Sequence, residues 1–212
     1  MSGLPFWELP QTLCIGGECV TINTDFRAGI RVRQMWWDPY FRQRGGLLLR
    51  YSAQILFGEA RAQEICERED AASVMLWYLL DGRVPRSVIE RQMHASADAD
   101  LPGGAAAADE ACMGMSYLWD MPLISASFRQ VYGISLASAE MHLWEFDALL
   151  GALPADCALC RVIAARTADL SLISDDTQRA AAAAERVRLR LPSAQMLLDV
   201  YNDLHLCTKD KV

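Results

Sequence analysis

Apolar side chains recur at intervals of three or four positions along most of the chain, which predicts a protein built mainly from α-helices. The clearest stripe comprises Ala139, Leu143, Phe146, Leu150 and Leu153. The N-terminal region differs, because two short β-prone runs flank Gly16-Gly17, whose glycines suit a tight hairpin turn. The sequence therefore predicts a mainly α multi-helix bundle with a small N-terminal β-hairpin.

Capping and breaking residues bound the expected helices. Thr24 or Asp25 caps a helix through about Trp37, and Asp38-Pro39 ends it. Asp120 has the character of an N-cap, with Pro122 in the first turn, and Gly133 ends that helix. Ser135 or Ser138 then starts the helix that carries the stripe. Further helices are expected over 47–57, 59–80 (as one helix or two), 85–93, 156–166, 177–191 and 193–207.

We expect one helical domain over residues 1–212. Residues 94–114 are rich in Ala, Asp and Gly, which predicts a flexible loop inside that domain. The expected parts are a hairpin at 12–22, a helical hairpin core at 117–170 joined by a short connection, and C-terminal helices at 175–207.

Charge and cysteine usage narrow the class of protein. The net charge of −7 argues against nucleic-acid binding, which needs a basic face. The sequence lacks an apolar run long enough to span a membrane, and its first ten residues do not resemble a secretory signal. The seven cysteines are therefore expected as reduced thiols in a cytoplasm, including Cys14 and Cys19, which could face each other across the hairpin.

The apolar content of 52% allows two interpretations. Either some apolar surface meets a partner or another copy of the chain, or the alanine-rich helices raise the count without forming a patch. Arginines outnumber acidic residues over 25–50, which is compatible with a partner face or with an ordinary solvated helix face. The candidate partner face comprises Arg27, Arg31, Arg42, Trp36 and Trp37, although tryptophans also pack in cores.

Two residue pairs could carry chemistry, but each has a structural explanation. Cys157 and Cys160 could bind a metal or exchange electrons, but zinc needs two further ligands and none stands at suitable spacing. The alternative is two small buried side chains on a helix. His142 and Glu145 could form an acid–base pair or a hydrogen bond at a helix crossing. Without a nucleophile motif or phosphate loop, we expect no enzyme activity, no catalytic residue and no metal or other cofactor.

Several short motifs of the sequence, taken together, resemble those of the bacteriophage gene-product-fifteen family. They are Ile22-Asn-Thr-Asp-Phe-Arg27 after the hairpin, Tyr132-Gly133-Ile134, and the block from His142 to Phe146. The residues that match the family motifs are Thr24, Asp25, Phe26, Arg27, Tyr132, Gly133, His142, Trp144, Phe146 and Arg166. The sequence departs from the family at Leu143, where a tryptophan is usual, and at Ser135, where an acidic residue is usual.

The resemblance implies a function in phage or prophage tail morphogenesis. The family is similar in gene position and size to tail assembly chaperones of long-tailed phages, which bind the helical tape measure protein. It therefore implies tape measure or other tail proteins as partners, homo-oligomers, and the cytoplasm of the bacterial host as location. The motif residues are expected to serve the fold. The alternatives are a structural subunit retained in the virion tail and, more remotely, a small metal- or thiol-dependent enzyme.

Overall fold

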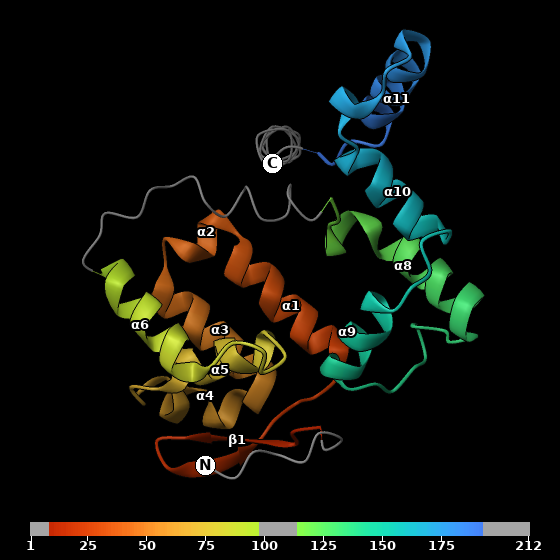
Figure 1. The fold of residues 1–212 in the computed structure, drawn as a ribbon. Helices are drawn as coiled ribbons and strands as arrows, with labels where there is room; N and C mark the ends of the chain where they lie inside the picture. Colours follow the sequence, from red (N-terminus) through yellow and green to blue (C-terminus); the bar gives the residue numbers. More distant parts are fainter. Residues whose placement is uncertain (1–8, 98–113, 193–212) are drawn as a thin grey trace, which may run out of the picture.

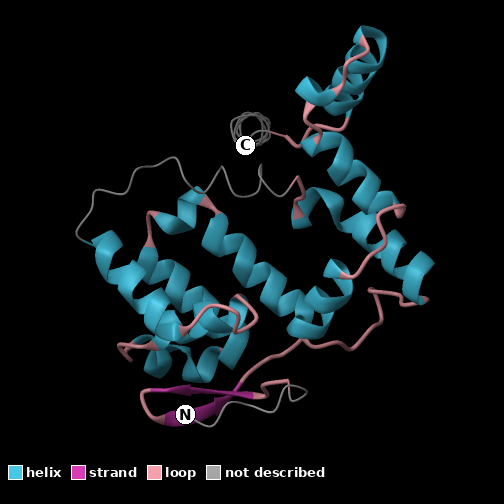
Figure 2. Ribbon diagram, in the orientation of Figure 1, coloured by secondary structure: helices cyan, strands magenta, loops and turns pink. Residues whose placement is uncertain are grey.

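The computed structural model describes residues 9–97 and 114–192, apart from the side chains of Trp37, Pro39, Arg42 and residues 94–97. The predicted fold class is confirmed, because the described chain is mainly helical with one small β-hairpin (Figure 1; Figure 2). None of the described helices has the length and apolar character needed to cross a membrane.

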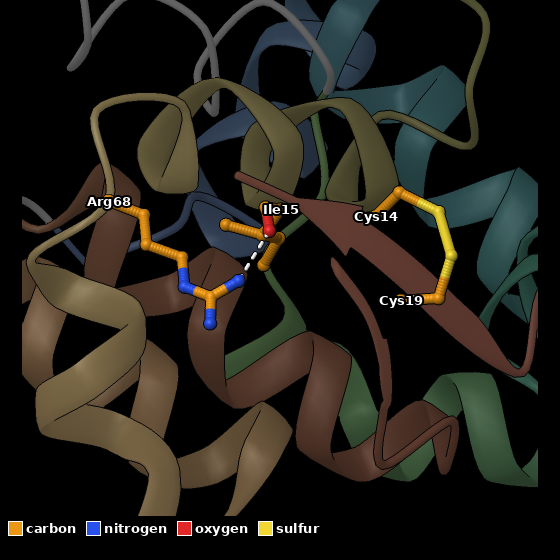
Figure 3. The surroundings of a disulfide bond; sticks show 4 residues. All are labelled: Cys14, Ile15, Cys19 and Arg68. Atoms are coloured by element: carbon orange, nitrogen blue, oxygen red, sulfur yellow. Dashed lines mark hydrogen bonds between the residues drawn. A yellow bond between two sulfur atoms is a disulfide. The ribbon is translucent and has the colours of Figure 1, made fainter. Parts of the chain in front are cut away.

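The hairpin joins β1 (Thr12–Ile15) to β2 (Glu18–Thr21), and Gly16 and Gly17 both have positive φ at the turn, as predicted. The antiparallel register places Cys14 directly opposite Cys19, and the two form a disulfide (Figure 3). The expectation of two thiols is therefore wrong for this pair. Directly paired positions in an antiparallel ladder bring their side chains close together, which places the two sulfur atoms within bonding reach.

Ion pairs and hydrogen bonds hold the hairpin on the helices. Arg68 donates from Nη1 to the carbonyl of Ile15 at 2.6 Å (Figure 3), and its Nη2 pairs with Glu18. The amide of Gly16 donates to Oδ1 of Asp70 at 2.8 Å. A two-stranded hairpin is marginal alone, so these contacts explain how it keeps its place.

Helix α1 (Phe26–Trp37) runs through the middle of the molecule, with α3, α5 and α9 packed against it (Figure 1). Its start and end match the prediction. Asp25 is the N-cap and its side chain accepts the amide of Arg27, while Asp38 ends the helix. A short helix, α2 (Pro39–Arg42), follows and was not predicted.

The helices after α2 form one side of the molecule. They are α3 (Gly45–Phe57), α4 (Glu59–Cys66), α5 (Ala71–Leu79) and α6 (Arg86–Ala97). Gly58, with φ of 85°, separates α3 from α4, and Asp81 and Gly82, both with positive φ, follow the end of α5. The predicted loop at 94–114 is wrong over 94–97, which continue α6, and residues 98–113 lie outside the described chain.

The other side contains α8 (Tyr117–Tyr132), α9 (Leu143–Gly151), α10 (Ala158–Thr167), the 3-10 turn η1 (Leu170–Leu172) and α11 (Asp176–Arg188). Helix α11 projects away from the body at the end of α10 (Figure 1), and none of its residues is buried. The predicted helix over 193–207 lies outside the described residues.

Two predicted helix starts on this side are wrong. Helix α8 begins at Tyr117 with Ser116 as N-cap, so Asp120 lies in its first turn and Pro122 inside it. Helix α9 begins at Leu143 with His142 as N-cap, not at Ser135 or Ser138. In both cases a long-range contact fixes the position of the side chain. Asp120 binds Arg166, and His142 lies against the carbonyl of Pro10.

The core is one apolar cluster shared by the hairpin, α1, α3 to α5 and α8 to α10. Its centre is a run of stacked rings in which Phe146 lies 4.8 Å from Phe26 and 5.2 Å from Phe128, centroid to centroid. Helices far apart in the sequence are thus joined through Phe146, which is fully buried.

Candidate functional site

The two sequence blocks that carry the family resemblance meet in space. Asp25 and His142 form an isolated antiparallel bridge. The amide of Phe26 donates to the carbonyl of Met141 at 3.1 Å, and the amide of Leu143 donates to the carbonyl of Thr24 at 2.9 Å. The starts of α1 and α9 are therefore joined by backbone hydrogen bonds, which fixes the angle at which both helices enter the core.

Asp25 and Arg27 hold the first turn of α1. The carboxylate of Asp25 accepts the amide of Arg27 at 2.7 Å and pairs with its guanidinium at 2.8 Å. Nη2 of Arg27 also donates to the carbonyl of Leu136 at 2.6 Å, and its guanidinium lies over the ring of Phe26. Arg27, which sequence analysis placed in a partner face, is thus committed to bonds within the chain.

His142 acts as a helix cap. Its Nδ1 accepts the amide of Trp144 at 3.0 Å, and its Nε2 lies 3.0 Å from the carbonyl of Pro10. This pairing requires the neutral ring with its proton on Nε2. Burial lowers the pKa of His142, an effect that its bond to Pro10 partly offsets. Both ring nitrogens are occupied, and Glu145 is exposed, so the structure does not assemble the acid–base pair considered above.

The remaining motif residues support the same junction. The indole N–H of Trp144 donates to the carbonyl of Tyr78 at 2.8 Å, and the hydroxyl of Tyr132 donates to the carbonyl of Leu149 at 2.8 Å. Gly133 ends α8 in the left-handed conformation with φ of 72°. These groups bind backbone carbonyls at helix ends, which is the use expected of residues that serve the fold.

Arg166 forms a buried ion pair with Asp120. It donates two hydrogen bonds to Asp120, at 2.6 and 2.9 Å, and one each to the carbonyls of Gly114 and Leu189. Asp120 also accepts the amide of Ser116. The pair joins α8, α10 and the residue after α11, which explains why Asp120 does not cap its helix.

Arg33 forms another buried ion pair, with Asp147, and sequence analysis did not identify it. It donates two hydrogen bonds to Asp147, at 2.7 and 2.6 Å, one to Asp81 at 2.9 Å, and one to the carbonyl of Leu79. Burial and the hydrogen bond with Asp147 raise the pKa of Asp81 to about 7. Burial by itself would lower the pKa of Arg33, but its bond to Asp147 outweighs this effect and raises it. The sequence signal that could have identified this buried ion pair is the position of Arg33 on the apolar side of α1.

The structure describes the side chains of three residues of the predicted partner face, Arg27, Arg31 and Trp36. Arg31 is exposed, and Trp36 is half-buried, with its indole N–H donating to Ser52 at 3.0 Å. The side chains of Trp37 and Arg42 lie outside the described part of the structure.

Next to these positions lies an exposed surface that sequence analysis missed. We call it the aromatic–arginine surface, and it comprises Tyr40, Phe41, Arg44, Leu47, Arg50 and Tyr51. The rings of Tyr40 and Phe41 are 5.4 Å apart, those of Phe41 and Tyr51 are 6.1 Å apart, and the guanidinium of Arg44 lies 4.0 Å above Tyr40. Unlike the buried arginines, Arg44 and Arg50 form no ion pair with any described residue.

The cysteine pair at 157 and 160 lies at the start of α10. The Cys157 thiol is buried and accepts the amide of Cys160 at 3.4 Å, so it caps the helix. Among the described residues, no group of three or more His, Cys, Asp or Glu side chains could hold a metal ion.

A surface hollow elsewhere is lined by Glu69, Asp70, Ser73, Glu90 and Met93. Arg86 already pairs with Asp70 there.

The described chain thus defines a helical protein whose motif residues hold its helices together and which exposes aromatic and arginine side chains on α2 and α3. A family model, that of the Bacteriophage Gp15 protein, matches residues 7–188. The match covers most of the chain and includes every motif residue named above, so this protein belongs to the Bacteriophage Gp15 family. No curated protein and no solved structure matches it.

Proposed function

We propose that this protein is a tail assembly chaperone that binds the tape measure protein while a phage tail assembles, in the cytoplasm of the bacterial host. Membership of a bacteriophage family supports a phage-related function. The tape measure protein is, on this proposal, a long chain with apolar helical stripes. Such a chain needs a partner that covers those stripes until the tail tube surrounds it.

The observation that carries the proposal is the set of large apolar side chains that remain exposed although the chain has a complete core. Tyr40 is 55% exposed, Tyr51 45% and Leu172 82%. All three lie on helices or helical turns, where they can pack against another helix without opening the fold. The acidic net charge of −7 keeps such a protein soluble despite these side chains.

Several side chains that could carry chemistry are engaged within the fold, which supports a binding function. His142 caps α9, Arg33 and Arg166 each bind carboxylates and backbone carbonyls, and Cys157 caps α10. We therefore propose a non-enzymatic function that needs no cofactor and uses several copies of the chain along one tape measure protein.

Co-expression tests the proposal. The chain is expressed together with successive fragments of the tape measure protein from the same phage, and each fragment is also expressed alone. We expect at least one fragment to become soluble and to co-purify only when the chain is present. If every fragment remains insoluble and none co-purifies, the proposal fails.

The alternative, a structural subunit of the tail, makes a different prediction about the finished particle. A chaperone leaves before the tail is complete, whereas a structural subunit remains. Mass spectrometry of purified virions should therefore detect the major tail proteins and no peptides of this chain. Detection in amounts comparable with a tail subunit would favour the structural alternative.

A further inference from the structure

We infer that the aromatic–arginine surface is the docking site for an amphipathic helix that carries acidic side chains beside its apolar stripe. This inference rests on the proposed function, because it names the surface and the kind of segment through which a tape measure protein would be held. The occupant is a polypeptide helix of a partner protein. A nucleic acid is treated below as an outcome that would contradict the inference.

The shape of the surface follows from two short helical elements. Tyr40 and Phe41 lie on α2, and Leu47 and Tyr51 lie one turn apart on α3, so their side chains share one face of that helix. Tyr40, Leu47 and Tyr51 are each more than 40% exposed, and the half-buried Phe41 ring contacts both tyrosines edge to face. Contiguous aromatic side chains of this kind are typical of the centres of protein interfaces.

The two arginines on this surface, Arg44 and Arg50, form no ion pair with a carboxylate of the described chain. Arg44 donates to the carbonyl of Tyr40 at 3.0 Å and stacks on its ring, which holds the guanidinium flat against the aromatic cluster. Arg50 is exposed and lies on the turn after Leu47. The carboxylate of Asp38 accepts the amide of Tyr40 at 2.7 Å and forms no ion pair with either arginine. Two guanidinium groups without a carboxylate partner on an acidic protein can form ion pairs with carboxylates of another chain.

Two glycines, Gly45 and Gly46, form the start of α3 beside these side chains. Both are exposed, and a Cβ added at either would contact nothing within 4 Å. Neither has a positive φ, so the fold itself does not require glycine there. Their value is explained if the backbone of a partner helix passes close to this turn, where a side chain would obstruct it.

The same features exclude strand addition at this site. Its backbone lies in helices, so it presents no row of free amides and carbonyls to pair with a strand, and recognition must use side chains. An apolar stripe would pack on the rings, and flanking Glu or Asp side chains would meet Arg44 and Arg50. The protein's net charge of −7 repels a polyanion such as a nucleic acid. A helix with carboxylates on one flank is attracted locally, because those carboxylates meet Arg44 and Arg50.

A designed peptide provides the test. The probe is a fluorescein-labelled helical peptide of about 20 residues. It has a leucine stripe at helical spacing and glutamates on both flanks, and its lysine-flanked counterpart has the same stripe. We expect fluorescence anisotropy to show binding of the glutamate peptide by the full-length chain, weakening as salt rises. The lysine peptide should bind at least about tenfold more weakly.

Variants assign this binding to the surface. Tyr40→Ser/Tyr51→Ser and Arg44→Glu/Arg50→Glu should each weaken the glutamate peptide at least about tenfold, as expected for interface centres. Gly46→Ala should also weaken it, although the helical circular dichroism should be kept and the melting temperature should be equal or slightly higher. The matched controls Val131→Ser and Arg129→Glu, both exposed on α8, should bind as the unmodified chain does.

Three results would overturn the inference. They are unchanged affinity in the folded surface variants, tighter binding of the lysine peptide, and tighter binding of a single-stranded oligonucleotide of similar length than of the glutamate peptide. If a double variant fails to fold, Gly46→Ala and the salt dependence of the unmodified chain decide instead.

The outcome is separable from that of the proposed function. If the chain keeps tape measure fragments soluble and the surface variants do so equally well, the surface is wrong and the function stands. If the glutamate peptide binds at this surface but no fragment is held, the docking site stands and the tape measure proposal fails.

Discussion

Arg33 and Asp147 form a two-pronged ion pair, with N–O distances of 2.7 and 2.6 Å, in which both side chains are almost fully shielded from solvent. The pair joins α1 to α9, and the added bonds from Arg33 to Asp81 and to the carbonyl of Leu79 include the end of α5. Removing the guanidinium leaves the buried carboxylate of Asp147 without its cation, and leaves Asp81 with only the exposed Arg83 as ion-pair partner. Such a loss is strongly destabilising even where the intact pair itself adds little.

We therefore predict that Arg33→Met lowers the free energy of unfolding by about 3–5 kcal/mol. Urea denaturation followed by circular dichroism measures the change. Arg31→Met, at an exposed position on the same helix, is the control and should stay within about 0.5 kcal/mol of the unmodified chain. Similar stabilities for the two variants would show that Arg33 does not hold the helices together.

A second prediction concerns pH and Asp81. Its folded pKa of about 7 lies above the ordinary aspartate value of 3.8. Between about pH 4 and 7 the unfolded chain releases this proton while the folded chain retains it, so the Asp81 contribution to stability falls as pH rises. Asp81→Asn removes this slope and suits the left-handed backbone at that position.

At pH 8 the Asp81→Asn variant should equal or exceed the unmodified chain in stability, by up to roughly 2 kcal/mol. Unfolding midpoints measured between pH 4 and 8 provide the comparison. Asp156→Asn, an exposed aspartate, should leave the profile unchanged. A less stable Asp81→Asn variant at pH 8 would contradict the raised pKa.

His142 should act in the opposite direction. Burial lowers its pKa below the ordinary value of 6.5, so the unfolded chain gains a proton first as pH falls. Its contribution to stability is therefore present above about pH 6.5 and is lost as pH falls below that value. His142→Asn should keep an acceptor for the amide of Trp144 while removing this pH dependence.

His142→Ala should in addition lose the helix cap and about 1 kcal/mol of stability at pH 8. Unfolding free energies of the two variants at pH 8 and pH 5.5 separate the cap from the titration. Equal stability of the alanine and asparagine variants at pH 8 would mean that the Nδ1 bond contributes nothing.

The disulfide makes a fourth prediction. Cys14 and Cys19 close a short loop, so the chain-entropy gain from their bond is at most about 2 kcal/mol. The double variant Cys14→Ser/Cys19→Ser should lose no more than this and should keep its helical circular dichroism, because Arg68 and Asp70 still hold the hairpin. Alkylation without reductant should leave both cysteines of the purified chain unmodified. Rapid labelling of both would show that they are thiols.

Local signals were enough to predict the elements whose ends are decided locally. Asp25 caps α1 and Asp38-Pro39 ends it, because a short side chain and a proline act within one turn. The hairpin followed from Gly16-Gly17 in the same way. The helical fold class followed from the spacing of apolar residues, which needs no knowledge of partners.

Prediction failed where a distant contact determines how a residue is used. Asp120 is of a type that caps helices, but its carboxylate is held by Arg166 from another helix. The segment before α9 stays irregular because its backbone bonds to Thr24 and Phe26, and His142 caps that helix. Sequence spacing gives no information about such contacts.

The candidate surface was predicted only in part, for a related reason. The arginine excess over 25–50 includes the region of the aromatic–arginine surface. It did not separate Arg27 and Arg33, which pair with carboxylates, from Arg44 and Arg50, which pair with no carboxylate of the described chain. The unpredicted helix α2 places Tyr40 on the outside, and the ring of Phe41 contacts both Tyr40 and the exposed Tyr51.

The central claim, that this Gp15-family chain holds a tape measure protein in solution, is tested most directly by light scattering. Full-length tape measure protein from the same phage is diluted out of denaturant with and without a molar excess of the chain. We predict rapid aggregation of the tape measure protein alone, and a clear solution containing a complex of both proteins when the chain is present. Equal scattering in the two samples, with no complex in the supernatant, would contradict the account.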